Sequence, residues 1–84
     1  GRRTATGRIA RLILDIWSRL EKSGQTEDGS IEFPLRQTHI ADATGLTTVY
    51  VSKVINGFRK DSLVEVTDRS LKILDIEKLR MLAA

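Results

Sequence analysis

Apolar side chains recur at helical spacing near the start of the chain. Between residues 7 and 22 they fall three or four positions apart: Ile9, Leu12, Ile13, Ile16, Trp17 and Leu20. This spacing predicts a long amphipathic helix, with Trp17 as a core aromatic that anchors it. Residues 1 to 6 show no such pattern, so we expect a linker or disordered end there.

A second helical stripe lies between residues 47 and 60. Its apolar members stand at positions i, i+3, i+4 and i+7: Val51, Val54, Ile55 and Phe58. Thr47 directly precedes the helix, and its hydroxyl is suited to accept an amide hydrogen from the first turn. The opposite face is small, hydrogen-bonding or cationic: Thr48, Val49, Ser52, Lys53 and Asn56. No acid occurs between Ala43 and Lys60. Such a face suits a DNA major groove, but an ordinary amphipathic helix shows the same pattern, so the stripe alone leaves both interpretations open.

The segment before this helix favours the DNA interpretation. Residues 36 to 44 form a short predicted helix, with Ile40 and Ala43 apolar. Ala41 offers the small side chain that two crossing helices need at their closest approach. Gly45 then provides a turn, because glycine enters left-handed conformations at little cost. A short helix, a glycine turn and a capped second helix make a helix-turn-helix.

Strand patterns flank this unit. Residues 31 to 33 alternate like a short strand that Pro34 ends. The runs 63 to 66 and 70 to 74 surround a turn at residues 67 to 69, which predicts a hairpin. Asp75 should cap a last helix whose core-facing residues are expected to be Ile76, Leu79 and Leu82.

Two residues suggest a weak end to the 47–60 helix. Gly57 lies in its interior, and Ser62 follows it where a helix-ending glycine would be favourable. We therefore expect the last turn to be frayed.

Composition narrows the classes of function. The chain has 84 residues, which is enough for one small core. It has no cysteine and one histidine, which disfavours a metal site. No apolar run approaches the length of a membrane span, and no nucleophile–base pair or phosphate-binding glycine loop is present, so we expect neither an enzyme nor a membrane protein. The net charge of +3 permits a nucleic-acid partner without requiring one.

Several short motifs together resemble one protein family. They are Ile31-Glu32-Phe33-Pro34-Leu35-Arg36-Gln37, Ile40-Ala41-Asp42, Thr44-Gly45-Leu46-Thr47 and Val51-Ser52-Lys53-Val54. In this order and spacing they resemble the C-terminal domain of Crp–Fnr transcription regulators. The resemblance implies a winged helix-turn-helix over residues 7 to 83, mainly α with a small antiparallel β-sheet. It also implies sequence-specific binding of double-stranded DNA in the cytoplasm of a bacterium.

The resemblance further implies which residues contact bases and which contact phosphates. The helix at about 47–60 would enter the major groove, and the wing at about 63–74 would lie on the DNA backbone. Base edges would be met by Thr48, Val49, Ser52 and Lys53. Phosphates would be held by Gln37, Thr38, Thr47, Tyr50 and Arg69. For Arg69, an exposed turn residue without a DNA role is the open alternative.

The family's other parts are expected outside this chain. They are an effector-binding domain, whose ligand this sequence does not identify, and a dimerisation helix that would pair two copies on a palindromic site. No cofactor is expected in the chain itself. The loop at residues 23–30 would either contact RNA polymerase or be a solvated connection. The competing function is a winged helix that docks another protein and does not bind DNA sequence-specifically.

Overall fold

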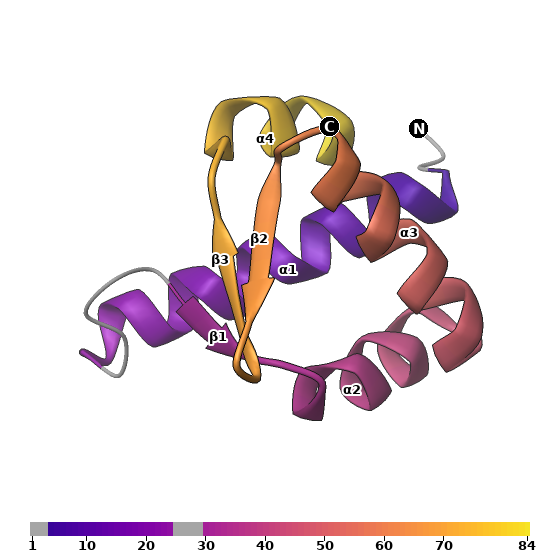
Figure 1. The fold of residues 1–84 in the computed structure, drawn as a ribbon, viewed down its shortest axis with the longest axis horizontal. Coiled ribbons are helices and arrows are strands. Elements are labelled where there is room, and N and C mark those ends of the chain that lie inside the picture. Colours follow the sequence, from indigo (N-terminus) through magenta and orange to yellow (C-terminus); the bar gives the residue numbers. More distant parts are fainter. Residues whose placement is uncertain (1–3, 25–29) are drawn as a thin grey trace.

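The computed structural model describes residues 4–24 and 30–84, which form four helices and a three-stranded antiparallel sheet. In chain order these elements are α1 (Ala5–Lys22), β1 (Ser30–Glu32), α2 (Leu35–Thr44), α3 (Thr48–Lys60), β2 (Val64–Thr67), β3 (Ser70–Ile73) and α4 (Ile76–Ala83). In Figure 1, α1 crosses behind the sheet, α2 and α3 follow each other on one side, and α4 lies at the end of the hairpin opposite its turn. The predicted winged helix-turn-helix architecture is confirmed.

The first helix begins two residues earlier than its apolar pattern indicated. Thr4 is the N-cap, and its Oγ1 accepts a hydrogen bond from the Gly7 amide at 3.0 Å. This bond satisfies one of the free amides of the first turn, so Ala5 and Thr6 are helical. Residues 1–3 of the expected linker and 25–29 of the expected loop lie outside the described residues.

The core lies between α1, the outer helices and the sheet. Its most deeply buried large side chains come from every helix and from the hairpin: Ile9, Ile13, Ile40, Val51, Ile55, Leu63, Val64, Leu71 and Leu79. Trp17 and Val54 are half-buried and pack against this cluster. Leu82 was expected in the core, but it is 41% exposed, and Ala83 is buried in its place. The buried stripe of α4 runs through Leu79 and Ala83, and successive residues of a helix point about 100° apart, so Leu82 turns outward.

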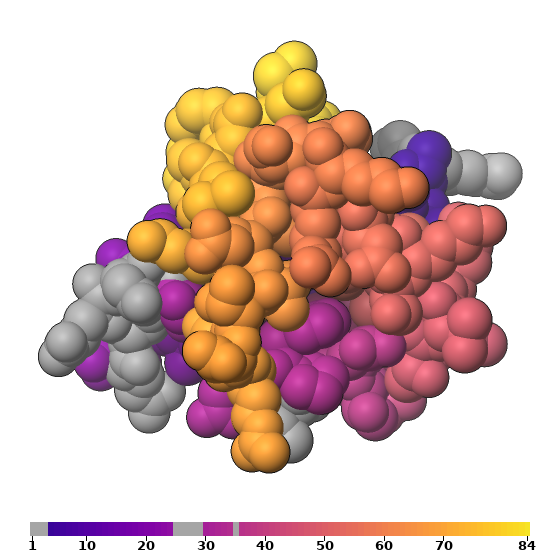
Figure 2. Space-filling model, in the orientation of Figure 1, coloured from indigo at the N-terminus to yellow at the C-terminus, as the bar shows by residue number. Residues whose placement is uncertain are grey.

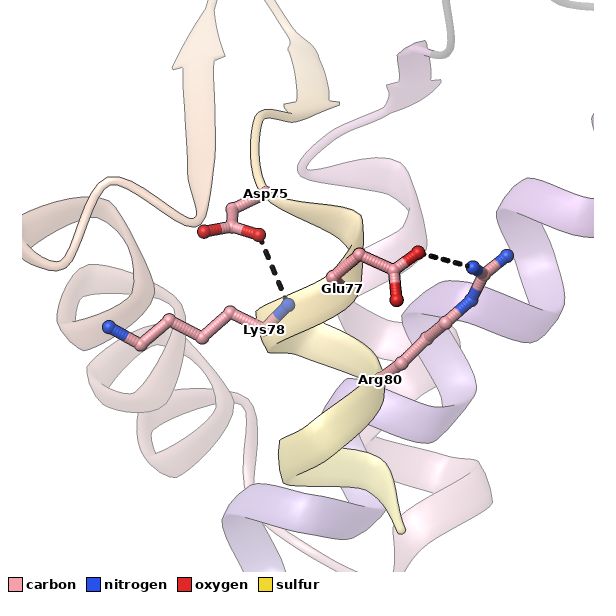
Figure 3. A network of polar contacts seen from close by, with 4 residues as sticks. All are labelled: Asp75, Glu77, Lys78 and Arg80. Atoms are coloured by element: carbon pink, nitrogen blue, oxygen red, sulfur yellow. Dashed lines mark hydrogen bonds and ion pairs between the residues drawn. The ribbon is translucent and has the colours of Figure 1, made fainter.

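Polar contacts fix the start of α4, as Figure 3 shows. The Asp75 carboxylate accepts a hydrogen bond from the Lys78 amide at 3.1 Å, which confirms the predicted cap. Arg80 Nη1 lies 2.9 Å from Glu77 Oε1 on the exposed side of the helix. Because both side chains are mostly exposed, water screens this pair, and the cap is the more important contact.

The end of α3 is closed, which corrects the expectation of a frayed turn. The Leu63 amide donates to the Phe58 carbonyl at 2.9 Å, and the Ser62 amide donates to the Arg59 carbonyl at 3.1 Å. These two bonds form a Schellman motif, which satisfies carbonyls that a helix end otherwise leaves free. Ser62 occupies its left-handed position with φ 59°, a conformation usually taken by glycine. The sequence pattern wrongly predicted fraying, because these two hydrogen bonds compensate for the unfavourable conformation of Ser62.

This geometry makes Ser62→Gly a stabilising change. A left-handed residue with a Cβ costs about 1–2 kcal/mol, and the extra freedom of glycine in the unfolded chain returns about 0.5–1 kcal/mol of that. We expect the free energy of unfolding in urea to rise by about 0.5–1 kcal/mol. Asp61→Gly is the control, because Asp61 has φ −86° and gains nothing from glycine. A loss of stability in both variants would contradict the prediction.

The sheet has the order β1-β3-β2, with every neighbouring pair antiparallel. The β2–β3 hairpin, called the wing below, turns at Asp68 and Arg69, whose φ angles of 43° and 64° match a type I′ turn. The Phe33 amide donates to the Arg69 carbonyl at 2.8 Å, so the turn is tied to the segment just before α2. Figure 2 shows the turn projecting from the body of the molecule.

Candidate nucleic-acid interface

The turn between α2 and α3 sets the angle at which α3 is presented. Gly45 has φ 73°, and its amide donates to the Ala41 carbonyl. The Leu46 amide donates to the same carbonyl at 3.0 Å. Ala41 itself is 3% exposed, so its small side chain is buried beside the turn. Gly45 therefore provides the predicted turn of the helix-turn-helix, and two hydrogen bonds to the Ala41 carbonyl close it.

The first turn of α3 is held from two sides. Thr47 Oγ1 accepts a hydrogen bond from the Tyr50 amide at 3.0 Å, which confirms its predicted role as N-cap. Gln37 on α2 donates from Nε2 to the Thr48 carbonyl at 2.8 Å. The Gln37 bond joins residues 11 positions apart and could not be predicted from local spacing. It leaves Gln37 with one amide hydrogen for another acceptor.

The outward face of α3 forms a shallow hollow with a volume of about 610 Å³. Its lining residues come from α2 and α3: Gln37, Thr48, Val49, Ser52, Lys53, Asn56, Gly57 and Lys60. All four residues predicted to meet base edges are therefore together on one surface. Val49 is the most exposed of the large apolar side chains in the described residues, at 78%.

The predicted phosphate-holding residues are more dispersed. Gln37 lies at the hollow, whereas Thr38 is exposed in the first turn of α2. Thr47 and Tyr50 are exposed at the start of α3, and Arg69 is exposed at the turn of the wing. The set thus does not form a single cluster: of these residues only Gln37 lines the hollow, and Arg69 lines a separate hollow with Glu32, Phe33 and Pro34.

The predicted site omitted three residues of the hollow, Asn56, Gly57 and Lys60. Together with Lys53 they stand at i, i+3, i+4 and i+7, so the helical period that located the buried stripe could also have located them. Gly57 costs about 1 kcal/mol relative to alanine in a helix interior. A Cβ built on it would meet no described atom within 4 Å.

Positive charge dominates this face. Lys53, Arg59 and Lys60 are exposed on α3, which carries no acid. The ion pairs found among residues 4–24 and 30–84 join Arg11 to Asp15 and Glu77 to Arg80, away from α3. Arg59 Nη1 does donate to Asn56 Oδ1 at 3.4 Å, a weak contact between exposed side chains. The hollow is therefore suited to an anionic partner.

The described part of the chain lacks the features of a metal site, a buried polar site or a membrane span. It contains no group of three or more histidine, cysteine, aspartate or glutamate residues placed to hold a metal ion. None of its polar or charged residues is buried. None of its helices has the length and apolar character that a bilayer span requires.

Comparison with known proteins gives consistent matches. Residues 7–82 match the family model of the Crp-like helix-turn-helix domain. The chain is 34% identical over 83 residues to the nitrogen fixation regulation protein FixK of Rhizobium meliloti, covering 98% of this chain and 37% of FixK. Among solved structures it resembles the CRP-family transcriptional regulator TTHB099 of Thermus thermophilus, with 26% identity and a TM-score of 0.73. Reduced CprK without ligand is 28% identical, with a TM-score of 0.67. Both structural matches cover 98% of this chain, but only 41% of TTHB099 and 39% of CprK, so the chain spans well under half the length of these relatives.

Proposed function

The chain belongs to the Crp-like helix-turn-helix family of transcription regulators, and from this premise we propose that it binds double-stranded DNA sequence-specifically through α3. Membership of this family implies DNA binding by a regulator of transcription. To this we add that the hollow on α3 contacts the bases, that its residues have different roles, and that two copies of the chain act together.

One observation carries the proposal: Thr48, Val49, Ser52 and Lys53 line the same outward hollow on a helix without acids. The major groove of B-DNA admits an α-helix, and base edges there offer acceptors, donors and the thymine methyl. The hydrogen bonds from Gln37 and to Thr47 hold the first turn of this helix, so the side chains are presented on a rigid element.

Within the hollow we assign different readings to two residues. Lys53 is the donor for guanine O6 and N7, which lysine can reach as a flexible point charge. Val49 offers only methyl groups, whose natural partner is the thymine methyl. Thr48 and Ser52 supply adaptable hydroxyls beside them. Phosphate contacts from Gln37, Thr38, Thr47, Tyr50 and Arg69 would fix register without reading sequence.

We further propose that two copies act together on a palindromic site. Their recognition helices would lie about 34 Å apart, one turn of DNA, and a dimerisation helix outside this chain would hold the copies. An effector domain, also outside this chain, would supply the regulatory signal. The regulator would act in the cytoplasm and engage RNA polymerase there.

Replacing Lys53 tests the assignment of base reading. With two copies of the chain held together by a fused dimerisation module, we expect selection from random duplexes to yield a motif with a guanine opposite Lys53. Lys53→Ala should remove that preference and cost about 1–3 kcal/mol on sites that carry the guanine. Arg69→Ala is the matched control, because loss of a phosphate contact should weaken all sequences alike.

The opposite pattern would reassign Lys53. If Lys53→Ala leaves the selected motif unchanged and lowers affinity uniformly, Lys53 holds a phosphate and does not read a base. If the wild-type chain selects no motif under these conditions, the proposed sequence specificity fails as a whole.

A further inference from the structure

Gly57 has no explanation within the described structure. Gly24 and Gly45 have φ angles of 72° and 73°, where a side chain would be strained, so the backbone itself accounts for them. Gly57 lies instead in the interior of α3, and a Cβ on it would meet no described atom within 4 Å. Alanine would fit there and favour the helix. No described residue therefore accounts for glycine at this position, whereas a bound partner would account for it.

The position of Gly57 indicates what that partner is. It follows Lys53 by four residues and precedes Lys60 by three, so the two lysines lie about one turn before and one turn after it along the helix. Tyr50 lies seven residues before Gly57, which is about two helical turns, on the same edge of the helix. Gln37, which also lines the hollow, approaches α3 at Thr48, in the helix's first turn.

The edge of a helix that reads bases is where the adjacent DNA strand passes. The residues in the middle of the outward face meet base edges, and those at its borders meet sugar and phosphate. Lys60, a cation on such a border, is placed to neutralise a phosphate there. A residue without a side chain lets a ligand approach the helix backbone more closely than any other residue does.

We propose that the sugar–phosphate backbone of DNA makes its closest approach to α3 over Gly57, between Lys53 and Lys60, and that the absent side chain permits this approach. The inference rests on the proposed DNA-binding function and adds a contact that is possible because Gly57 has no side chain. It makes Gly57 a residue that is unfavourable for folding and favourable for binding.

Two measurements on the 84-residue chain test the proposal. Gly57→Ala should raise the melting temperature by about 4–8 °C, because alanine favours the helix. The same variant should raise Kd for a mixed-sequence duplex of about 30 base pairs at low salt by about tenfold, which is about 1.4 kcal/mol. Gly57→Leu should raise Kd further. Ser18→Ala, a helix-interior change on α1, is the control and should leave Kd unchanged.

The outcomes separate this inference from the proposed function. If the wild-type chain binds the duplex and Gly57→Ala binds it equally or more tightly, the close approach is wrong and DNA binding stands. If Gly57→Ala fails to raise the melting temperature, the glycine serves the fold, and the inference is also overturned. If the wild-type chain does not bind the duplex at all, the proposed function fails and this inference fails with it.

Discussion

The affinity of the chain for duplex DNA is expected to fall about 500-fold when salt rises from about 50 to about 200 mM. A protein that neutralises Z phosphates releases condensed counterions, so log K falls against log salt with a slope of about −0.9Z. With about five phosphates engaged the slope is about −4.5, and a fourfold rise in salt gives the stated loss. The exposed cations Arg59, Lys60 and Arg69 would contribute most of the charge that neutralises phosphates. Fluorescence anisotropy with a labelled duplex across the salt range measures it.

Two charge-removing variants sharpen this experiment. Arg69→Gln should make the slope shallower by about 1, because one phosphate contact is lost. Arg19→Gln removes the same charge from the part of α1 that Figure 1 shows far from α3, and it should leave the slope unchanged. A flat response in the wild-type chain would favour the protein-docking interpretation of this fold. Equal slope changes in both variants would mean that only net charge matters.

Phe58→Ala should cost about 3–5 kcal/mol of the free energy of unfolding. Phe58 is 3% exposed, and its removal leaves a cavity that surrounding side chains fill only partly. Domains of this size are stabilised by about 0.05–0.15 kcal/mol per residue, so the variant would lose much of its stability. The melting temperature should fall by more than about 12 °C. Calorimetry and urea titration of the purified chain provide the measurement.

Met81→Ala is the matched control for this core substitution. Met81 is also a large apolar residue in a helix, but it is 77% exposed. Its truncation should change stability by no more than about 0.5 kcal/mol. If Phe58→Ala costs less than about 1 kcal/mol, the burial of the end of α3 against the core is wrong.

Periodic patterns and local caps predicted much of this fold. The stripe from Val51 to Phe58 and the cap at Thr47 located α3, because each depends only on neighbours along the chain. Asp75 likewise marked the start of α4. The same period placed the four expected base-reading residues on one face, and the structure gathers them in one hollow. Whether they read bases is a separate prediction that the proposed experiments test.

Features that depend on tertiary structure were harder to predict from the sequence. The bond from Gln37 to Thr48 needs the packing of α2 on α3 before either residue can be placed. Ser62 closes α3 in a conformation that its residue type disfavours, so propensity pointed the wrong way. Leu82 fits an apolar stripe as well as Ala83 does, and only the position of α4 on α1 decides which is buried.

The pairing of β1 with β3 has a consequence for folding. Ile31 and Leu71 are partners in the sheet, so the chain between them, which holds all of α2 and α3, is closed into a loop of about 40 residues. The entropy lost in closing this loop must be recovered from contacts between residues that are distant in sequence. The two helices that present the hollow are therefore not an independent module. Their orientation relative to the sheet depends on the pairing of the strands on both sides of them, so a ligand that requires that orientation stabilises the whole domain.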